Sequence, residues 1–168
     1  MIKSNSHLFS PPPSFTQICS LIKEGREVLL VTSGAVGIGR QLLSKQQRLS
    51  LSVRDVVSGL PPAAKGDGYD SACAAAGQLG LMSLYETLFS TRQVASSQIL
   101  VTGFDFNCDN RREHIQYCVN SLLKLGIVPI INENDAVSGN EGYTETTVFS
   151  DNDSLAGLVA SATQAELL

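Results

Sequence analysis

The chain has 168 residues, of which 43% are hydrophobic and 17% charged, and its formal net charge is −4. This is enough apolar side chain for the core of one globular domain. No basic run supports a nucleic-acid partner, no apolar run approaches the ~20 residues of a membrane-spanning helix, and residues 1–15 lack the apolar core of a secretory signal. We therefore expect a cytoplasmic protein with no nucleic-acid or membrane partner, although local donors can still bind an anionic substrate.

The four cysteines and two histidines show no C-x-x-C pair and no spacing typical of a metal site. Three of the cysteines fall inside helical patterns. This favours reduced core cysteines of a cytosolic protein over a disulfide framework. The residues are Cys19, Cys73, Cys108, Cys118, His7 and His114.

The N-terminal part predicts an arm, a helix and a strand. Residues 1–13 end in three prolines and predict an irregular N-terminal arm. Apolar residues at helical spacing over 15–22 predict a helix that stops at Gly25. The continuous apolar run "EVLLVT" (27–32) predicts a strand buried on both faces, and it leads into the small-residue loop "SGAVGIGR" (33–40).

The middle of the chain is weakly patterned until a long apolar helix begins. Residues 41–70 give little signal, and within them 58–70 predict a surface loop rich in glycine and proline. The segment 71–89 predicts a helix whose first half is almost wholly apolar. We expect that half to be deeply buried or to form a subunit contact.

The C-terminal part repeats the order of helix, glycine, strand and polar loop. "SQILVT" (97–102) predicts a strand, and the apolar spacing over 115–123 predicts an amphipathic helix that stops at Gly126. "IVPII" (127–131) predicts another buried strand, although Pro129 argues against a central position in the sheet.

Alternating helices and buried strands predict an α/β fold, an open and mainly parallel sheet sandwiched by helices. In such sheets ligands bind at the carboxyl ends of the strands. The polar loops 33–40 and 132–142 follow two of the strands, and we expect the start of the helix at 151 to lie beside them.

The segment "TSGAVGIG" contains a hydroxyl donor, Ser33, and glycines that let backbone N–H groups approach an anion. It is neither a Walker A motif nor G-x-G-x-x-G. On its own, the pattern fits a tight strand-to-helix turn without a ligand equally well.

The segment "NENDAV" places four hydrogen-bonding side chains directly after a buried strand. Asn132 and Asn134 can donate to a carboxylate, and Asp135 can receive an ammonium group. Because Asn and Asp are favoured turn residues, a capped turn explains this segment equally well when it is taken alone.

The segment "SDNDSLAGL" predicts a helix start with two acids and an amide. Asp151 is the expected N-cap, and Asn152 and Asp153 fall in the first turn, where carboxylates suit the helix dipole. A structural role explains one acid well and the amide poorly. Together, the three segments describe a pocket for a small amino acid.

Five motifs resemble, in order, those of the glutamate 5-kinases of the amino acid kinase family, a module that also forms the N-terminal half of bifunctional Δ1-pyrroline-5-carboxylate synthases. The resemblance covers residues 15–162. It implies ATP- and Mg²⁺-dependent phosphorylation of the γ-carboxylate of L-glutamate, the first step of proline biosynthesis. The motifs are "LLVTSGAVGIGR", "AAAGQLGLMSLYE", "LVTGFDFNCDNR", "GIVPIINENDAVS" and "DNDSLAGLVA".

The resemblance also implies a role for individual residues. Ser33 and the N–H groups of Gly34 and Ala35 would lie at the phosphoryl-transfer end of the glutamate site. Asp135 would bind the α-ammonium group.

At the later helix, Asn152 together with Asn132 would hold carboxylate oxygens, and Asp153 would be the catalytic aspartate that orients lysines around the transferring phosphoryl group. Asp151 would then only cap the helix. The family further implies feedback inhibition by proline and a homo-oligomer, either a dimer or a tetramer.

Two departures from the family pattern stand beside the resemblance. Residues 1–13 lie where the family has a first strand and a K-x-G-[ST] loop with a phosphate-contacting lysine, and Lys3 has no glycine partner. After "SATQAELL" the family continues with its nucleotide-binding half. We therefore expect residues 14–168 to be a partial amino acid kinase domain that holds the glutamate-binding part.

Three alternatives stay open. The chain could be a catalytically inactive fragment that binds glutamate or proline, or that associates with full-length subunits. It could be another kinase of the superfamily, acting on acetylglutamate, aspartate, carbamate or uridylate, although "INENDAV" followed by "DND" argues against this. It could also be a generic α/β domain with capped turns.

Overall fold

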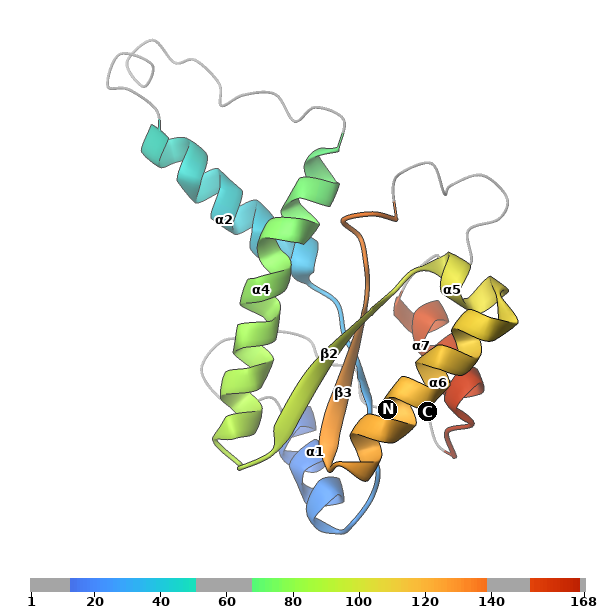
Figure 1. The fold of residues 1–168 in the computed structure, drawn as a ribbon. Coiled ribbons are helices and arrows are strands. Elements are labelled where there is room, and N and C mark those ends of the chain that lie inside the picture. Colours follow the sequence, from blue (N-terminus) through green and yellow to red (C-terminus); the bar gives the residue numbers. More distant parts are fainter. Residues whose placement is uncertain (1–12, 51–67, 139–151, 167–168) are drawn as a thin grey trace.

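The protein was analysed as a computed structural model that describes residues 13–50, 68–138 and 152–166. Figure 1 shows a parallel sheet with helices on both of its faces. The strand order is β1-β3-β2, so the last of the described strands lies in the middle. The strands are β1 (Leu30–Val31), β2 (Ala95–Val101) and β3 (Ile127–Glu133).

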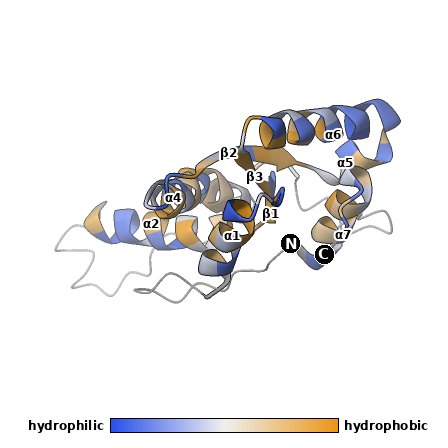
Figure 2. Cartoon of the chain, turned by 90° about the horizontal axis from the view of Figure 1, so that it is seen from below, coloured by the Kyte–Doolittle hydropathy of each residue, from blue (hydrophilic) through white to orange (hydrophobic). Residues whose placement is uncertain are grey.

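The helices form one layer on each face of the sheet, with α1, α2 and α4 on one side and α6 and α7 on the other (Figures 1 and 2). The short helix α5 follows β2 directly. The predicted class, an open parallel sheet between helices, is confirmed. The helices are α1 (Pro13–Lys23), α2 (Ala35–Ser50), α4 (Tyr69–Ser90), α5 (Gly103–Asn107), α6 (Asp109–Lys124) and α7 (Asn152–Thr163).

Strands β1 and β3 contribute to two hydrophobic cores because their successive side chains point to opposite faces. Leu30 and Ile130 pack under the layer of α1 and α4, whereas Val31 and Ile131 pack under α6 and α7. Leu30 pairs with Ile130 and Val31 with Ile131 in the parallel register. Both faces of β1 and β3 are therefore covered, which explains why the sequence of each of these two strands contains a continuous apolar run.

Pro129 does not keep its strand at the edge, and that prediction was wrong. β3 is the central strand, and Pro129 pairs with Ser97 of β2. In a parallel strand, alternate residues present their N–H and C=O groups to opposite neighbours. Thr32 N–H donates to Ile131 O, so Pro129, two residues earlier, faces β1. There β1 pairs only with Ile130 and Ile131, and the missing N–H costs no ladder bond.

The predicted small-residue loop 33–40 is also corrected, since α2 begins at Ala35 and runs to Ser50. Of the predicted surface loop 58–70, residues up to 67 lie outside the described part, and Tyr69 and Asp70 belong to α4. Of the predicted arm 1–13, the described part contains only Pro13, which starts α1.

The four cysteines are all free thiols, in agreement with the sequence prediction. Only two of them are core residues. Cys19 and Cys73 are buried, but Cys108 and Cys118 are exposed, contrary to what was expected of them.

Helices α2 and α4 cross at a distance that only glycine permits. A Cβ at Gly39 would lie 1.7 Å from the carbonyl oxygen of Cys73, and a Cβ at Gly77 would lie 1.9 Å from the carbonyl oxygen of Ala35. Real Cβ atoms do not come this close to backbone, so neither position accepts a side chain without moving a helix. The two glycines thus bring the start of α2 against α4.

Two glycines of α2 provide a matched pair that tests this crossing. Gly39→Ala should lower the free energy of unfolding by about 3 kcal/mol or more, since overpacking against rigid backbone lies at the upper end of such costs. Gly37→Ala should raise it by about 0.5–1 kcal/mol, because a Cβ there meets nothing within 4 Å and alanine favours the helix. Urea unfolding of both variants measures the difference, and equal effects would contradict the close crossing.

Candidate functional site

The carboxyl end of β1 is held in place before the chain turns into α2. Thr32 is buried, its N–H donates to Ile131 O at 2.9 Å, and its Oγ1 lies 2.6 Å from the hydroxyl of Tyr85 on α4. The first bond joins β1 to the central strand, and the second joins it to the helix layer. The turn that follows therefore starts from a fixed point.

The turn from β1 into α2 consists of Ser33 and Gly34. Ser33 is exposed, and Gly34 has a φ of 120°, a conformation that residues with a side chain rarely adopt. Ala35 begins α2 and is 1% exposed. Because the first N–H groups of a helix have no intrahelical acceptor, this turn presents backbone donors next to the Ser33 hydroxyl.

The carboxyl end of the central strand carries Asn132, which is only 2% exposed. Its Nδ2 donates to Oε1 of Gln78 on α4 at 3.1 Å. Val31 of β1 pairs with Ile131 of β3. Asn132 follows Ile131 directly, so it lies beside the point where Thr32 and Ser33 continue from β1. The structure thus places Ser33, Gly34 and Asn132 at neighbouring strand ends.

A tight turn follows β3 and contains Asp135. The N–H of Asn134 donates to Val101 O of β2 at 2.8 Å, and the N–H groups of Val137 and Ser138 donate to Asn134 O at 3.0 Å. The segment therefore forms a tight turn. It is held by backbone bonds, which leave the Asp135 carboxyl free of hydrogen bonds and ion pairs to any other described residue.

Two neighbouring carboxyl groups, one on the last residue of β3 and one in the turn, have raised pKa values. Burial raises the pKa of the Asp135 carboxyl above its ordinary value. Burial and the negative charge of Asp135 raise the pKa of Glu133, and an interaction with Ser138 opposes this only in part. A cation bound between them would relieve both effects, since an opposite charge favours the ionised form.

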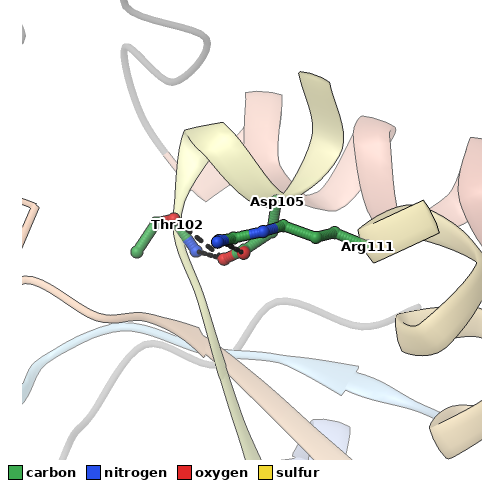
Figure 3. A network of polar contacts seen from close by, with 3 residues as sticks. All are labelled: Thr102, Asp105 and Arg111. Atoms are coloured by element: carbon green, nitrogen blue, oxygen red, sulfur yellow. Dashed lines mark hydrogen bonds and ion pairs between the residues drawn. The ribbon is translucent and has the colours of Figure 1, made fainter. Parts of the chain in front are cut away.

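The end of β2 carries a polar network that the sequence analysis did not single out (Figure 3). Asp105 Oδ2 accepts hydrogen bonds from Thr102 N at 2.6 Å and Thr102 Oγ1 at 2.8 Å, and Arg111 Nη1 lies 2.8 Å from Oδ1. Thr102 precedes α5 and Asp105 is its third residue, which is a capping box. The threonine followed three residues later by an acid is the signal that could have revealed it.

The electrostatics of Asp105 are opposite to those of Asp135. Burial alone would raise the pKa of Asp105, but the hydrogen bonds from Thr102 and Arg111 outweigh it and hold that pKa below its ordinary value. The Arg111 side chain is 62% exposed, so solvent screens its charge and the two Thr102 bonds contribute more. The Asp105 carboxylate is thus paired through both of its oxygens, and these contacts stabilise the carboxyl end of β2.

The last predicted site residues belong to α7, which packs against β1 and α6 through Leu155, Ala156 and Val159. Asp153 lies in the first turn and is exposed. Asn152 is the first residue of the helix, the placement of its side chain is not described, and Asp151 lies outside the described residues. α7 approaches the sheet from the layer opposite α4, at the strand that leads to Ser33.

Membrane-spanning and metal-binding features are both absent from the described residues. No helix among them is long and apolar enough to cross a membrane. Within the same residues, no group of three or more His, Cys, Asp or Glu side chains is arranged to hold a metal ion.

Comparison with known proteins gives the family. The sequence profile of the amino acid kinase family matches residues 10–168. The chain is 47% identical over 157 residues to Delta-1-pyrroline-5-carboxylate synthase 1 of Oryza sativa subsp. japonica, with 90% of this chain and 21% of that protein covered. It is 39% identical over 151 residues to the glutamate 5-kinase of Streptococcus equi subsp. zooepidemicus, with 90% and 50% covered.

The chain therefore belongs to the amino acid kinase family. It spans about half the length of the glutamate 5-kinase relative and about a fifth of the synthase relatives that it matches. The predicted resemblance to glutamate 5-kinases and to these synthases is confirmed by those similarities.

The capping box at Asp105 gives a first prediction for this region. Asp105→Ala should lower the free energy of unfolding at pH 7 by about 1–3 kcal/mol, because it leaves the part-buried donors of Thr102 unpaired. The loss should fade as the pH falls. The folded pKa lies below that of the unfolded chain, so the stabilisation is full above about pH 4 and disappears as Asp105 protonates. Urea unfolding between pH 3 and 7 measures it, and Asp109→Ala, at an acid whose side chain is 83% exposed, is the control.

The raised pKa of Asp135 predicts that replacing this residue changes the free energy of unfolding in the opposite direction. Above the folded pKa, ionisation of Asp135 costs the folded state free energy, whereas below about pH 4 both states are protonated and the cost vanishes. Asp135→Asn should therefore make the ligand-free chain more stable at pH 7, with a gain that shrinks toward pH 4.

Glu113→Gln, which removes one exposed carboxylate from α6, controls for net charge in the same unfolding series. A loss of stability in Asp135→Asn at pH 7 would contradict the electrostatic account of the turn.

Proposed function

We propose that this chain is the glutamate-binding part of a kinase that transfers the γ-phosphoryl group of ATP to the γ-carboxylate of L-glutamate, the first step of proline biosynthesis, in the cytoplasm. The observation that carries the proposal is the half-buried carboxyl of Asp135, which has no partner among the described residues. It lies in the turn that follows Asn132 and the end of β3, at the same carboxyl edge of the sheet as the Ser33–Gly34 turn. Similarity to a glutamate 5-kinase supports the choice of substrate.

Each end of glutamate has a matching group in this arrangement. Asp135 binds the α-ammonium group, whose positive charge offsets the cost that burial adds to ionisation of this carboxyl. Asn132 and Asn152 hold carboxylate oxygens. Ser33 and the backbone N–H groups of Gly34 and Ala35 hold the reacting end, where negative charge develops at the helix start.

In this phosphoryl transfer the side chains mainly position the reactants. A carboxylate is already a nucleophile near pH 7, so no general base is needed, and catalysis consists of aligning two anions and neutralising their charge. Asp153 orients the groups around the transferring phosphoryl group. Mg²⁺ bound with the phosphates of ATP would neutralise part of their charge. Because such an ion needs only one or two protein carboxylates, a three-residue cage is not required.

Regulation and assembly follow the same family pattern. Proline carries the carboxylate and ammonium of an amino acid, so it can compete for Asp135 and the carboxylate donors as a feedback inhibitor. Self-association into a dimer or tetramer is supported by large apolar side chains on the outer face of α4, where Leu79 is 76% exposed. Both assignments rest on the proposed function.

A second candidate function is binding without phosphoryl transfer. It is favoured by one feature of the sequence, the lack of the K-x-G-[ST] segment that supplies a phosphate-contacting lysine in the family. In this case the chain binds glutamate or proline, or pairs with full-length subunits, and does not turn over ATP.

Turnover of ATP with L-glutamate separates the two candidates. The chain should be assayed as it is and after extension at both ends with the matching segments of the Streptococcus equi enzyme, with the acyl phosphate trapped by hydroxylamine. We expect hydroxamate from the extended chain, and Asp153→Ala should reduce kcat by about 100-fold or more. Asp109→Ala, which alters a first-turn acid of α6, should not.

The possible outcomes discriminate clearly. Glutamate binding without hydroxamate in either form would favour the second candidate. Turnover with acetylglutamate, aspartate, carbamate or uridylate, but not with glutamate, would contradict the proposed substrate.

A further inference from the structure

Within the described residues, only one of the two polar atoms of the Gln78 amide has a hydrogen-bond partner. Its Oε1 accepts a hydrogen bond from Asn132 Nδ2 at 3.1 Å. Its Nε2 is buried and has no hydrogen-bond partner among the described residues, the only side-chain nitrogen or oxygen there of which this is true. Buried polar atoms without partners are rare in folded proteins, and each requires an explanation.

The position of Gln78 suggests where the missing partner lies. The preceding residue, Gly77, packs on the carbonyl oxygen of Ala35, and Leu81, one turn later, lies 3.8 Å from where a Cβ at Gly34 would be. One turn further along α4, Tyr85 contacts Thr32. This face of α4 therefore lies along the β1–α2 turn, and Gln78, the residue next to Gly77, is bonded to Asn132 at the end of the neighbouring strand.

The bond to Asn132 also fixes which way the Gln78 amide faces. Because Oε1 is occupied as an acceptor, the other end of the amide can only be a donor. A carboxylate accepts hydrogen bonds with either oxygen and donates none, so it is complementary to the donor in both orientations, whereas an amide ligand is complementary only through its carbonyl oxygen. The pair Gln78–Asn132 thus selects for an acceptor at this point of the site.

We propose that Gln78 is a substrate-binding and specificity-determining residue, whose Nε2 donates a hydrogen bond to a carboxylate oxygen of bound glutamate. The inference rests on the proposed function and adds to it a contact from α4. Through Oε1, the same side chain positions Asn132. Loss of Gln78 therefore affects substrate recognition twice, by the missing donor and by a released Asn132.

The test replaces the donor while it keeps the acceptor. Gln78→Glu retains an oxygen for Asn132 and puts a second oxygen where Nε2 was. Gln78→Met keeps the approximate shape and removes both functions. Gln116→Glu on α6, a glutamine that is also partly buried, is the control. For the full chain, NMR titration gives the Kd of L-glutamate and L-glutamine, and thermal unfolding checks that each variant is folded.

We expect Gln78→Glu to weaken L-glutamate binding by at least about tenfold near pH 8, since a hydrogen bond to a charged group is replaced by repulsion. Lowering the pH toward 5 should restore part of the affinity as the new carboxyl protonates and regains a donor. Gln116→Glu should leave both Kd values unchanged. A purely structural role for Gln78 would not produce this dependence on pH.

Comparing the Kd values of L-glutamate and L-glutamine shows which carboxylate of glutamate Nε2 contacts. If Gln78→Glu weakens glutamate but not glutamine, Nε2 contacts the side-chain carboxylate, and if it weakens both equally, it contacts the α-carboxylate; each result supports the proposal. Unchanged glutamate affinity in folded Gln78→Glu, or in Gln78→Met where the first variant does not fold, would overturn it and leave the proposed function intact. Failure of the unsubstituted chain to bind glutamate would instead overturn the proposed function, and this inference with it.

Discussion

The contact between α2 and α4 depends on the two places where a side chain is missing. Gly39 meets the backbone of Cys73, and Gly77 meets the carbonyl of Ala35, at distances that no Cβ could occupy. This close approach brings the first two turns of α2 against the first half of α4. It also brings Gln78, the neighbour of Gly77, to the end of the central strand, where it bonds to Asn132. The helix layer and the candidate site thus share one constraint.

The strand ends differ in how completely their polar groups are satisfied. At the end of β2, Asp105 is bonded to Thr102 and Arg111, and its pKa is lowered. At the end of β3, Asp135 has a raised pKa, and nearby the amide nitrogen of Gln78 is buried without a partner in the described part of the chain. The first arrangement stabilises the fold, and the second costs it stability. Such a cost is expected where a ligand supplies the missing partners.

Apolar periodicity in the sequence was sufficient to predict the core of the fold. Strands buried on both faces, helices ending near Gly25 and Gly126, and parallel order all follow from local patterns. Periodicity did not predict α2, because its mixed and glycine-containing sequence is typical of a loop. The glycines are explained only by the close packing of α4 against this helix. Periodicity also failed for Pro129, whose place in the central strand depends on how far β1 extends beside it.

The sequence by itself determined the family, the α/β class and the polar segments that end the strands, since these are properties of residue order and type. Only the tertiary structure decided which polar groups meet. The bond between Gln78 and Asn132 joins residues 54 positions apart, and the raised pKa of Asp135 arises from burial in a turn that β2 and β3 form together. Hydrogen bonding and desolvation depend on distances in space, which a linear sequence does not contain.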